Sequence, residues 1–277
     1  MSTSIPNSGP PRSVDLPVAL SIAGSDSGGG AGIQADLKTF HAFGVFGTTA
    51  ITALTAQDTT GVHGVHAVPV DMVRRQIQVV AADLRPSACK SGMLATAELV
   101  EAVAEEIVAL RLPAYVLDPV MVATSGDRLL DRDAESAVSD RLLPLCAVVT
   151  PNLEEAALLV GVVVGTEKEM TRAGRELVER GAGAALVKGG HLEGGEVVDV
   201  LVDAEGVRTW RRPKIETRHT HGTGCTLSAA IAAGLAHGRT LREAVDDALD
   251  FAHRAIATAP GLGAGHGPLN HFVAARR

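Results

Sequence analysis

The sequence has few aromatic residues and no excess of positive charge. Phe, Trp and Tyr together make up 3% of the 277 residues, which removes the stacking surfaces that proteins use to bind single-stranded nucleic acid. Acidic residues outnumber basic ones, 32 to 25, for a net charge of −7. Because binding to a phosphate backbone needs clustered Lys and Arg, the composition argues against nucleic acid as the main partner.

Cysteines and long apolar runs are scarce as well. Cys89, Cys146 and Cys225 are the three cysteines, and their spacing is typical neither of zinc sites nor of a disulfide framework. We therefore expect a reducing compartment, the cytoplasm, with Cys146 in the core. No apolar run has the length of a membrane span or of a signal peptide, so we expect no membrane association.

The remaining composition is that of a soluble globular protein, 46% hydrophobic and 21% charged. Residues 1–17 are rich in Ser, Pro and Gly and are expected to form a disordered tail. The length suits one large α/β domain over 18–277, since no linker interrupts it.

Short apolar runs alternate with stretches of helical period along this domain. The runs predict strands at 18–23, 45–52, 87–90, 114–120, 147–150 and 184–188. The periodic stretches predict helices at 70–84, 96–110, 134–143, 153–160 and 169–180, followed by two final helices at 223–236 and 241–259. Such alternation predicts βαβ units and a central, mostly parallel sheet flanked by helices on both faces. Residues 197–203 and 207–212 predict a hairpin appended at one edge.

The most informative segment is 218–230, where a glycine-spaced loop leads into an alanine-rich helix. Gly222 and Gly224 let an anion approach the free N–H groups of the helix start. Cys225 follows within the first turn, where the pKa of a thiol tends to fall. A plain glycine turn before a core helix, with an inert cysteine, is the alternative. Other polar residues favour a phosphate site.

These polar residues follow strand ends, where α/β sheets collect their chemistry. Asn152 and Glu155, three residues apart at a helix start, suit Mg²⁺, which binds through one or two carboxylates plus phosphates; they equally suit a helix N-cap. Lys188 ends an apolar strand, where a charge needs a partner. Asp36, one turn beyond a glycine loop, suits a substrate hydrogen bond or a helix-surface charge.

Three further patterns are weak or absent. Residues 30–35 match the dinucleotide pattern G-x-G-x-x-A, but too many residues separate the first glycine from the preceding strand. No G-x-x-x-x-G-K-[ST] sequence is present, which excludes a P-loop. His219 and His221 with Cys225 have poor spacing for zinc, and no further ligand pair is evident.

The motifs as a set resemble the hydroxymethylpyrimidine/phosphomethylpyrimidine kinases of thiamine biosynthesis, members of the ribokinase superfamily. The resemblance runs from about 18 to 272, with the motifs in the family's order. They are Ala23-Gly-Ser-Asp-Ser-Gly-Gly-Gly-Ala-Gly-Ile-Gln-Ala-Asp36, Thr55-Ala-Gln-Asp-Thr59, Lys90-Ser-Gly-Met-Leu94, Asp118-Pro-Val-Met-Val122, Thr150-Pro-Asn-Leu-Glu-Glu155, Val187-Lys-Gly-Gly-His191 and His219-Thr-His-Gly-Thr-Gly-Cys225.

The resemblance implies a ribokinase-like fold, a homodimer, and ATP-dependent phosphorylation of 4-amino-5-hydroxymethyl-2-methylpyrimidine and then of its monophosphate. It assigns the pyrimidine pocket to Gly24, Asp36, Gln57, Met93 and Val120. It assigns Mg²⁺ to Asp118 and Glu155, and the nucleotide to Asn152, Lys188, Thr220, Gly222 and Gly224. It assigns catalysis to Lys188, Gly222, Thr223, Gly224 and Cys225.

Two points stay open at this stage. Cys225 stands where most of the superfamily has an aspartate base, so it is either a thiolate base or a residue that only shapes the anion hole. A pyridoxal kinase of the same superfamily is the alternative function, although Gln57 and Met93 favour a pyrimidine. A nucleotide-sensing module would lack the lysine, the Asn-x-x-Glu pair or the loop nucleophile, and all are present. A dinucleotide-dependent oxidoreductase rests only on the weak pattern at 30–35.

Overall fold

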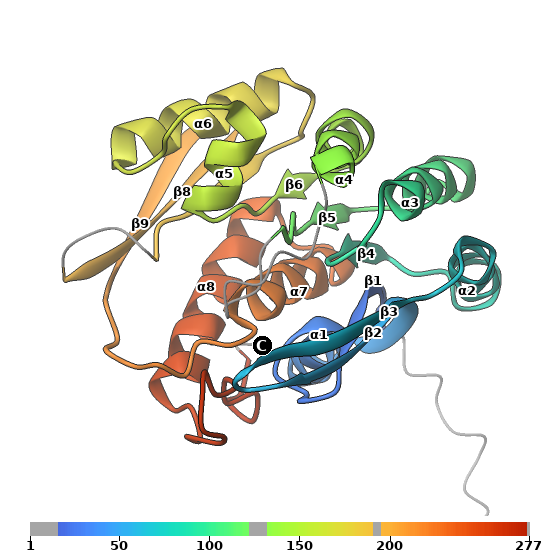
Figure 1. Ribbon diagram of the computed structural model, residues 1–277. Coiled ribbons are helices and arrows are strands. Elements are labelled where there is room, and N and C mark those ends of the chain that lie inside the picture. Colours follow the sequence, from blue (N-terminus) through green and yellow to red (C-terminus); the bar gives the residue numbers. More distant parts are fainter. Residues whose placement is uncertain (1–15, 122–131, 191–194, 276–277) are drawn as a thin grey trace, which may run out of the picture.

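The computed structural model describes residues 16–121, 132–190 and 195–275 (Figure 1). The expected tail, apart from its last two residues, lies outside these ranges, as do the motif residues Val122 and His191. The described strands form one nine-stranded sheet in the order β3-β2-β1-β4-β5-β6-β7-β8-β9. Six neighbouring strands, β2, β1, β4, β5, β6 and β7 in the order of the sheet, pair in parallel. At the two edges, β3 pairs antiparallel with β2, and β8 pairs antiparallel with β7 and β9. The expected mostly parallel sheet is confirmed.

The strands are β1 (Val18–Asp26), β2 (Phe46–Asp58), β3 (Gly61–Ala67), β4 (Ala88–Ser91), β5 (Tyr115–Leu117), β6 (Val148–Val149), β7 (Ala185–Lys188), β8 (Glu196–Asp203) and β9 (Gly206–Pro213). The α-helices are α1 (Gly32–Ala42), α2 (Val70–Leu84), α3 (Ala97–Leu110), α4 (Arg132–Ala137), α5 (Leu153–Val160), α6 (Glu167–Glu179), α7 (Thr223–Ala236) and α8 (Leu241–Ala257).

The helices cover both faces of the sheet and bury two hydrophobic clusters. One cluster packs α2, α3, α4, α5 and α6 against one face. The other packs α1, α7 and α8 against the opposite face, as Figure 1 shows. The inner strands β4, β5 and β6 are buried along their whole length, as expected of parallel strands covered on both sides.

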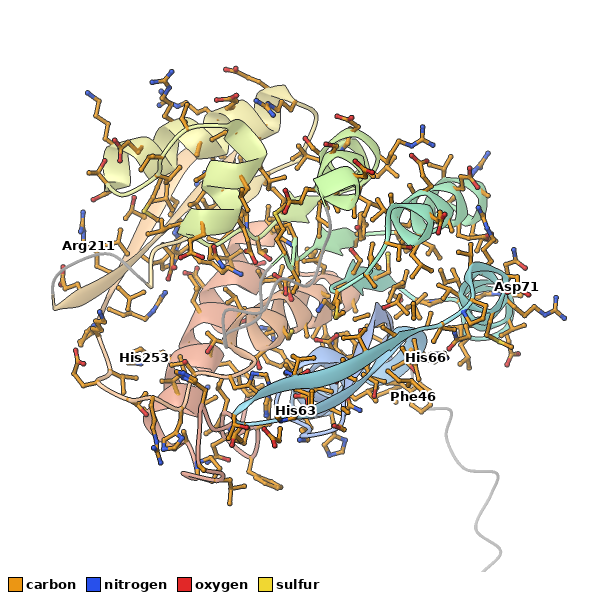
Figure 2. The ribbon with its side chains drawn as sticks, viewed as in Figure 1. Phe46, His63, His66, Asp71, Arg211 and His253 are labelled. Carbon is orange, nitrogen blue, oxygen red and sulfur yellow. The ribbon has the colours of Figure 1, made fainter. Side chains whose placement is uncertain are left out.

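The two edges of the sheet differ in how well the sequence predicts them. The hairpin β8–β9 is found where it was expected. The hairpin β2–β3 at the opposite edge was missed, because β3 (GVHGVHA) is interrupted by glycine and histidine and is largely exposed. Its residues His63 and His66 are labelled in Figure 2. An exposed edge strand lacks the buried apolar face that makes a strand recognisable.

Other elements differ in their ends. β1 continues past the expected Ala23 to Asp26, with a register shift against β2 between Ala23 and Ser25. The helix expected at 134–143 is α-helical only to Ala137 and continues as a π turn (Val138–Leu142) and a 3₁₀ turn (Leu143–Leu145). Pro144 lies in that last turn, where proline prevents a regular helix from continuing. None of the helices within the described ranges has both the length and the apolarity to cross a membrane.

The strand order indicates at which rim of the sheet a ligand would bind. The chain leaves β1 toward β2 on one side and returns through α2 to β4 on the other side, so the strand order reverses between β1 and β4. Ligands of open α/β sheets bind at the carboxyl ends of the strands beside such a reversal. The first turn of α7 lies at this rim, since α7 packs against β1, β4 and β5.

Candidate active site

The residues expected to bind an anion, 222–224, are the N-cap and first turn of α7. Gly222 is the N-cap of α7, in the left-handed region with φ 85°. A Cβ on this residue would lie 1.8 Å from the carbonyl oxygen of Gly30, so only glycine fits. The Thr223 hydroxyl donates to the carbonyl of Thr220 at 2.7 Å. The backbone N–H groups of the helix start therefore face the rim with the positive end of the helix dipole.

Lys188, at the end of β7, lies directly beside this loop. A Cβ on Gly224 would be 3.2 Å from Lys188 Nζ, so the glycine allows the close approach. The Nζ atom is 3.4 Å from Asp118 Oδ1 and 4.0 Å from Glu155 Oε2. Burial alone would lower the pKa of Lys188, but the charges of Asp118 and Glu155 outweigh it and raise that pKa. The lysine is therefore a cation held at the rim, beside the start of α7.

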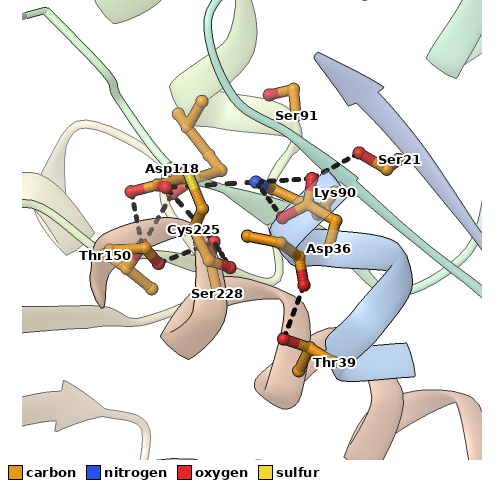
Figure 3. Close-up of polar contacts among 12 residues, drawn as sticks. Ser21, Asp36, Thr39, Lys90, Ser91, Asp118, Thr150, Cys225 and Ser228 are labelled. Carbon is orange, nitrogen blue, oxygen red and sulfur yellow. Dashed lines mark hydrogen bonds and ion pairs between the residues drawn. The ribbon is translucent and has the colours of Figure 1, made fainter. Parts of the chain in front are cut away.

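Asp118 follows β5 and is held from several sides (Figure 3). The Ser228 hydroxyl of α7 donates to Oδ2 at 3.2 Å, and the Thr150 hydroxyl lies 3.4 Å from Oδ1. Only 1% of the residue is exposed. Its carboxylate thus links the strand end to both α7 and Lys188.

Asn152 and Glu155 form a complete capping box at the start of α5. The Asn152 side chain accepts from the Glu155 N–H, and the Glu155 carboxylate accepts from the Asn152 N–H, both at 2.8 Å. Burial raises the pKa of Glu155 to about 7, a shift that Lys188 opposes and Asp118 reinforces. The cap and the position beside Lys188 coexist, so the two interpretations of this pair are compatible.

Asp118 and Glu155 are the residues that fit a magnesium ion. Both carboxylates approach Lys188, and Mg²⁺ binds through one or two carboxylates while phosphates and water complete its shell. The described residues contain no group of three or more His, Cys, Asp or Glu side chains able to hold a metal by themselves. His221 Nε2 pairs with Asp26 Oδ2 at 2.8 Å.

Cys225 differs from the expectation of a lowered pKa. Burial raises the pKa of its thiol to about 12, and the charges of Asp36 and Asp118 add to this, although Lys90 opposes it. The raised pKa favours the protonated thiol over the thiolate in the free protein.

Asp36 also differs from the expectation of a carboxylate open to substrate. It is 0% exposed, and it accepts from the Ser21 hydroxyl at 2.5 Å and from Lys90 Nζ at 3.1 Å. Lys90 is equally buried, and its Nζ lies 4.0 Å from Asp118 Oδ2. Although burial disfavours the charged lysine, Asp36 raises the pKa of Lys90 above its usual value. The Asp36–Lys90 ion pair therefore lies beneath the site (Figure 3).

The remaining residues assigned to the pyrimidine ring come from four neighbouring strands or strand ends, β2, β1, β4 and β5. Gly24 lies against Met93, since a Cβ on Gly24 would be 3.3 Å from the Met93 sulfur. Gln57 is half-buried near the end of β2, with Oε1 3.1 Å from the Thr55 hydroxyl. Val120 is half-buried two residues after Asp118.

Sequence analysis assigned no role to several residues that the structure brings into this rim. Lys90 ends a buried strand with a charge, and the argument that singled out Lys188 applies equally to it. Thr150 and Ser228 carry no comparable signal, because small hydroxyl residues are common in loops and helices. Asp26 and His221 are far apart in sequence, and nothing in the sequence pairs them.

Comparison with known proteins identifies the family. The family model described as phosphomethylpyrimidine kinase matches residues 26–270. A hydroxymethylpyrimidine/phosphomethylpyrimidine kinase of Rhizobium meliloti is 53% identical over 258 residues, covering 92% of this chain and 97% of the relative. The enzyme of the same name from Streptomyces coelicolor is 47% identical, covering 95% and 97%.

Solved structures show the same fold. A pyridoxal kinase of Bacillus subtilis, in an ADP complex, superposes with a TM-score of 0.86 at 38% identity, covering 92% of this chain and 97% of that one. A phosphomethylpyrimidine kinase of Clostridium difficile superposes with a TM-score of 0.78 at 39% identity, covering 87% and 99%. The match to the family model and the identity to curated relatives extend over most of the domain. The chain belongs to the phosphomethylpyrimidine kinase family.

Proposed function

We propose that this kinase phosphorylates 4-amino-5-hydroxymethyl-2-methylpyrimidine and then its monophosphate, using ATP, in the biosynthesis of thiamine diphosphate. The observation that carries the proposal is the position of Lys188 between two carboxylates and the start of α7. An ammonium group, the backbone N–H groups of a helix start and paired carboxylates at one point suit the transfer of a phosphoryl group. The named relatives support the choice of a pyrimidine.

The chemistry assigned to the site is mainly positioning and charge neutralisation, since a phosphoryl group passes through a loose transition state. Lys188 is assigned to the nucleotide phosphates, and Asn152 and Thr220 are assigned to the nucleotide with it. The N–H groups at 222–224 stabilise the negative charge on the transferred group. Gly222 and Gly224 keep these donors accessible, because a side chain at either residue would meet Gly30 or Lys188.

Asp118 and Glu155 would hold Mg²⁺ at this site. Bound there, the ion neutralises charge on the phosphate oxygens. In the protein itself Lys188 attracts both carboxylates. Its charge offsets part of the repulsion by which Asp118 raises the pKa of Glu155.

Cys225 is proposed as the base for the substrate hydroxyl, under a condition that its pKa imposes. A thiol with a pKa of about 12 holds its proton at neutral pH, so its pKa has to fall when the substrates bind. The neighbouring Lys90 favours the thiolate. The alternative is that Cys225 only shapes the loop and that the N–H groups supply the catalysis.

The pyrimidine ring is assigned to the pocket of Gly24, Gln57, Met93 and Val120. The Gln57 amide offers a donor and an acceptor side by side, which matches the polar edge of an aminopyrimidine. Met93 and Val120 provide apolar contacts to the faces of the ring. Asp36 contributes from below, by fixing Lys90.

A coupled ADP-release assay with hydroxymethylpyrimidine, its phosphate and pyridoxal as parallel substrates tests the function. We expect the two pyrimidines to be turned over and pyridoxal to be the weaker substrate. Pyridoxal is included because pyridoxal kinases superpose with a TM-score of 0.86. A preference for pyridoxal over both pyrimidines would contradict the proposal.

We also propose that the enzyme acts as a homodimer in the cytoplasm. Family analogy and the scattered, unpaired cysteines support these two assignments. The edge hairpin offers apolar side chains to a second copy, since Leu54 and Val65 are about half exposed. Light scattering coupled to gel filtration measures the mass of the particle, and a monomer at micromolar concentration would contradict the dimer.

A further inference from the structure

Two glycine loops that are far apart in sequence meet through a single side-chain contact. The first follows β1 and begins at Asp26; the second precedes α7 and contains His221. His221 Nε2 lies 2.8 Å from Asp26 Oδ2. Both side chains are nearly buried, with 11% and 3% of their surface exposed. A hydrogen bond between a ring N–H and a carboxylate is strong in such surroundings.

Asp26 organises the first loop from inside. Its carboxylate accepts hydrogen bonds from the backbone N–H groups of Gly28, Gly30 and Ala31 at 2.8, 3.0 and 2.8 Å. Burial alone would raise the pKa of Asp26, but the hydrogen bonds from His221 and from Ala31 lower it. The ionised carboxylate is therefore the centre around which 28–31 is folded.

His221 connects this loop to the anion hole. It immediately precedes Gly222, whose backbone lies against the carbonyl of Gly30. The ring of His221 lies against Gly30, where a Cβ would come within 2.5 Å of Cδ2. The backbone N–H of His221 also donates to the carbonyl of Gly267 at 3.2 Å. Three segments of the chain thus converge on one histidine.

The same histidine lies beside the pocket assigned to the ring. Its Nε2 is 3.5 Å from Gln57 Nε2, on β2. Since the Nε2 proton is directed to Asp26, this nitrogen offers no acceptor to the Gln57 amide, whose N–H groups remain available to a substrate. His221 therefore has the anion hole on one side and the ring pocket on the other.

We propose that His221 is a positioning residue that, through its hydrogen bond to Asp26, aligns the anion hole with the pocket that holds the acceptor substrate. Without that bond, Gly222 and its N–H donors are no longer fixed relative to the loop at 28–31. A displacement of about 1 Å between reacting groups lowers turnover by up to about 100-fold. Nucleotide binding at Lys188 is unaffected, because Lys188 is held by Asp118 and Glu155 instead.

Two substitutions separate this role from simple structural support. His221→Phe keeps a planar ring against Gly30 but removes the N–H. His221→Gln places an amide N–H near the original Nε2 and restores the donor to Asp26. We expect His221→Phe to lower kcat for hydroxymethylpyrimidine by about 10- to 100-fold, with KM for ATP within about twofold of the parent. His221→Gln should regain most of the lost kcat.

The matched control lies at the other end of α7. His237 Nε2 bonds to the carbonyl of Phe43 at 2.8 Å, so His237→Phe also removes one histidine hydrogen bond from this helix. We expect it to lower Tm as much as His221→Phe does, with kcat unchanged. Equal loss of kcat in both variants, or no rescue by His221→Gln, would show that His221 is only a structural support.

Hydrogen exchange of the ligand-free protein provides a readout that does not depend on activity. It therefore does not depend on the proposed substrate either. The amides of Gly28, Gly30 and Ala31 should exchange faster in His221→Phe and at the parent rate in His221→Gln. Unchanged exchange in His221→Phe would overturn the link between the loops. If the parent protein failed to phosphorylate the pyrimidine, the proposed function would fall while the exchange result still decided the link.

Discussion

The two ends of the site are built on very different parts of the molecule. The phosphate end lies on the inner strands β5 and β7 and on α7, a helix buried on nearly all sides from Thr226 to Gly234. Its charged groups, Asp118, Lys188 and Glu155, are linked to one another. The ring end, as assigned, reaches out to β2 beside an exposed edge hairpin, where Gln57 is half-buried and its side chain contacts Thr55 and His221.

This difference indicates which end can change. Removing Lys188 from this buried cluster would leave the charges of Asp118 and Glu155 without their shared cation and destabilise the protein by about 3–5 kcal/mol. A half-buried amide at the edge carries no such penalty. Pyridoxal kinases, which are named for another substrate, share this fold with a TM-score of 0.86. We infer that the phosphate end fixes the reaction and that the ring end adjusts the substrate.

The largest effect is expected at the phosphate end, from Cys225→Ala. If the sulfur takes the proton of the substrate hydroxyl, its removal lowers kcat by about 10²–10⁴-fold with little change in KM. Steady-state kinetics with hydroxymethylpyrimidine and ATP measure both constants. A variant that keeps most of its kcat would assign catalysis to the N–H groups at 222–224 and leave Cys225 as a residue that shapes the loop.

A smaller effect is expected at the ring end, from Gln57→Leu. The substitution keeps the volume of the side chain but removes the amide, so a hydrogen bond to the ring is lost while packing survives. We expect a loss of about 1–3 kcal/mol in kcat/KM for the pyrimidine. Tm should be nearly that of the parent. Unchanged kcat/KM would show that the ring does not bind at Gln57.

Glu155→Gln tests whether Glu155, which caps α5, also binds Mg²⁺. Glutamine preserves the capping box, so Tm should stay close to that of the parent, while the Mg²⁺ concentration needed for half-maximal rate rises about tenfold. Glu243 occupies the same position in the second capping box, at Thr240 of α8, and Glu243→Gln is the matched control. Identical Mg²⁺ titrations for Glu155→Gln and the parent would reduce Glu155 to its capping role.

The comparison also explains what the sequence could and could not predict. The inner strands and the loop at 222–224 were predictable, because burial on both faces gives continuous apolar runs and an anion loop needs glycine at fixed places. The edge strand β3 was missed, because exposure removes its apolar pattern. Distance along the chain hid the pairs that join loops, such as Asp26 with His221.

The electrostatic environment of Cys225 was the part that sequence analysis predicted wrongly. A helix N-terminus lowers the pKa of an exposed thiol, but the groups around the sulfur decide the direction of the shift. Folding brings Asp36 and Asp118 near it, and burial is the largest of the effects that raise its pKa. The local sequence around Cys225 shows that a helix starts there. It does not show that carboxylates from α1 and from the end of β5 lie nearby.

The smallest effect concerns the alkylation of Cys225 in the free enzyme. The rate of this reaction is the most direct check of the pKa of the Cys225 thiol. Only the thiolate reacts, so a thiol with a pKa of about 12 should react slowly at pH 7 and about tenfold faster for each pH unit up to the range where the protein stays folded. Cys89 and Cys146 are buried, and Cys225→Ala gives their background rate. A rate that levels off below pH 8 would show a lowered pKa instead. The sulfur would then be a thiolate before substrate binds, and the phosphate end would need no change on binding to provide its base.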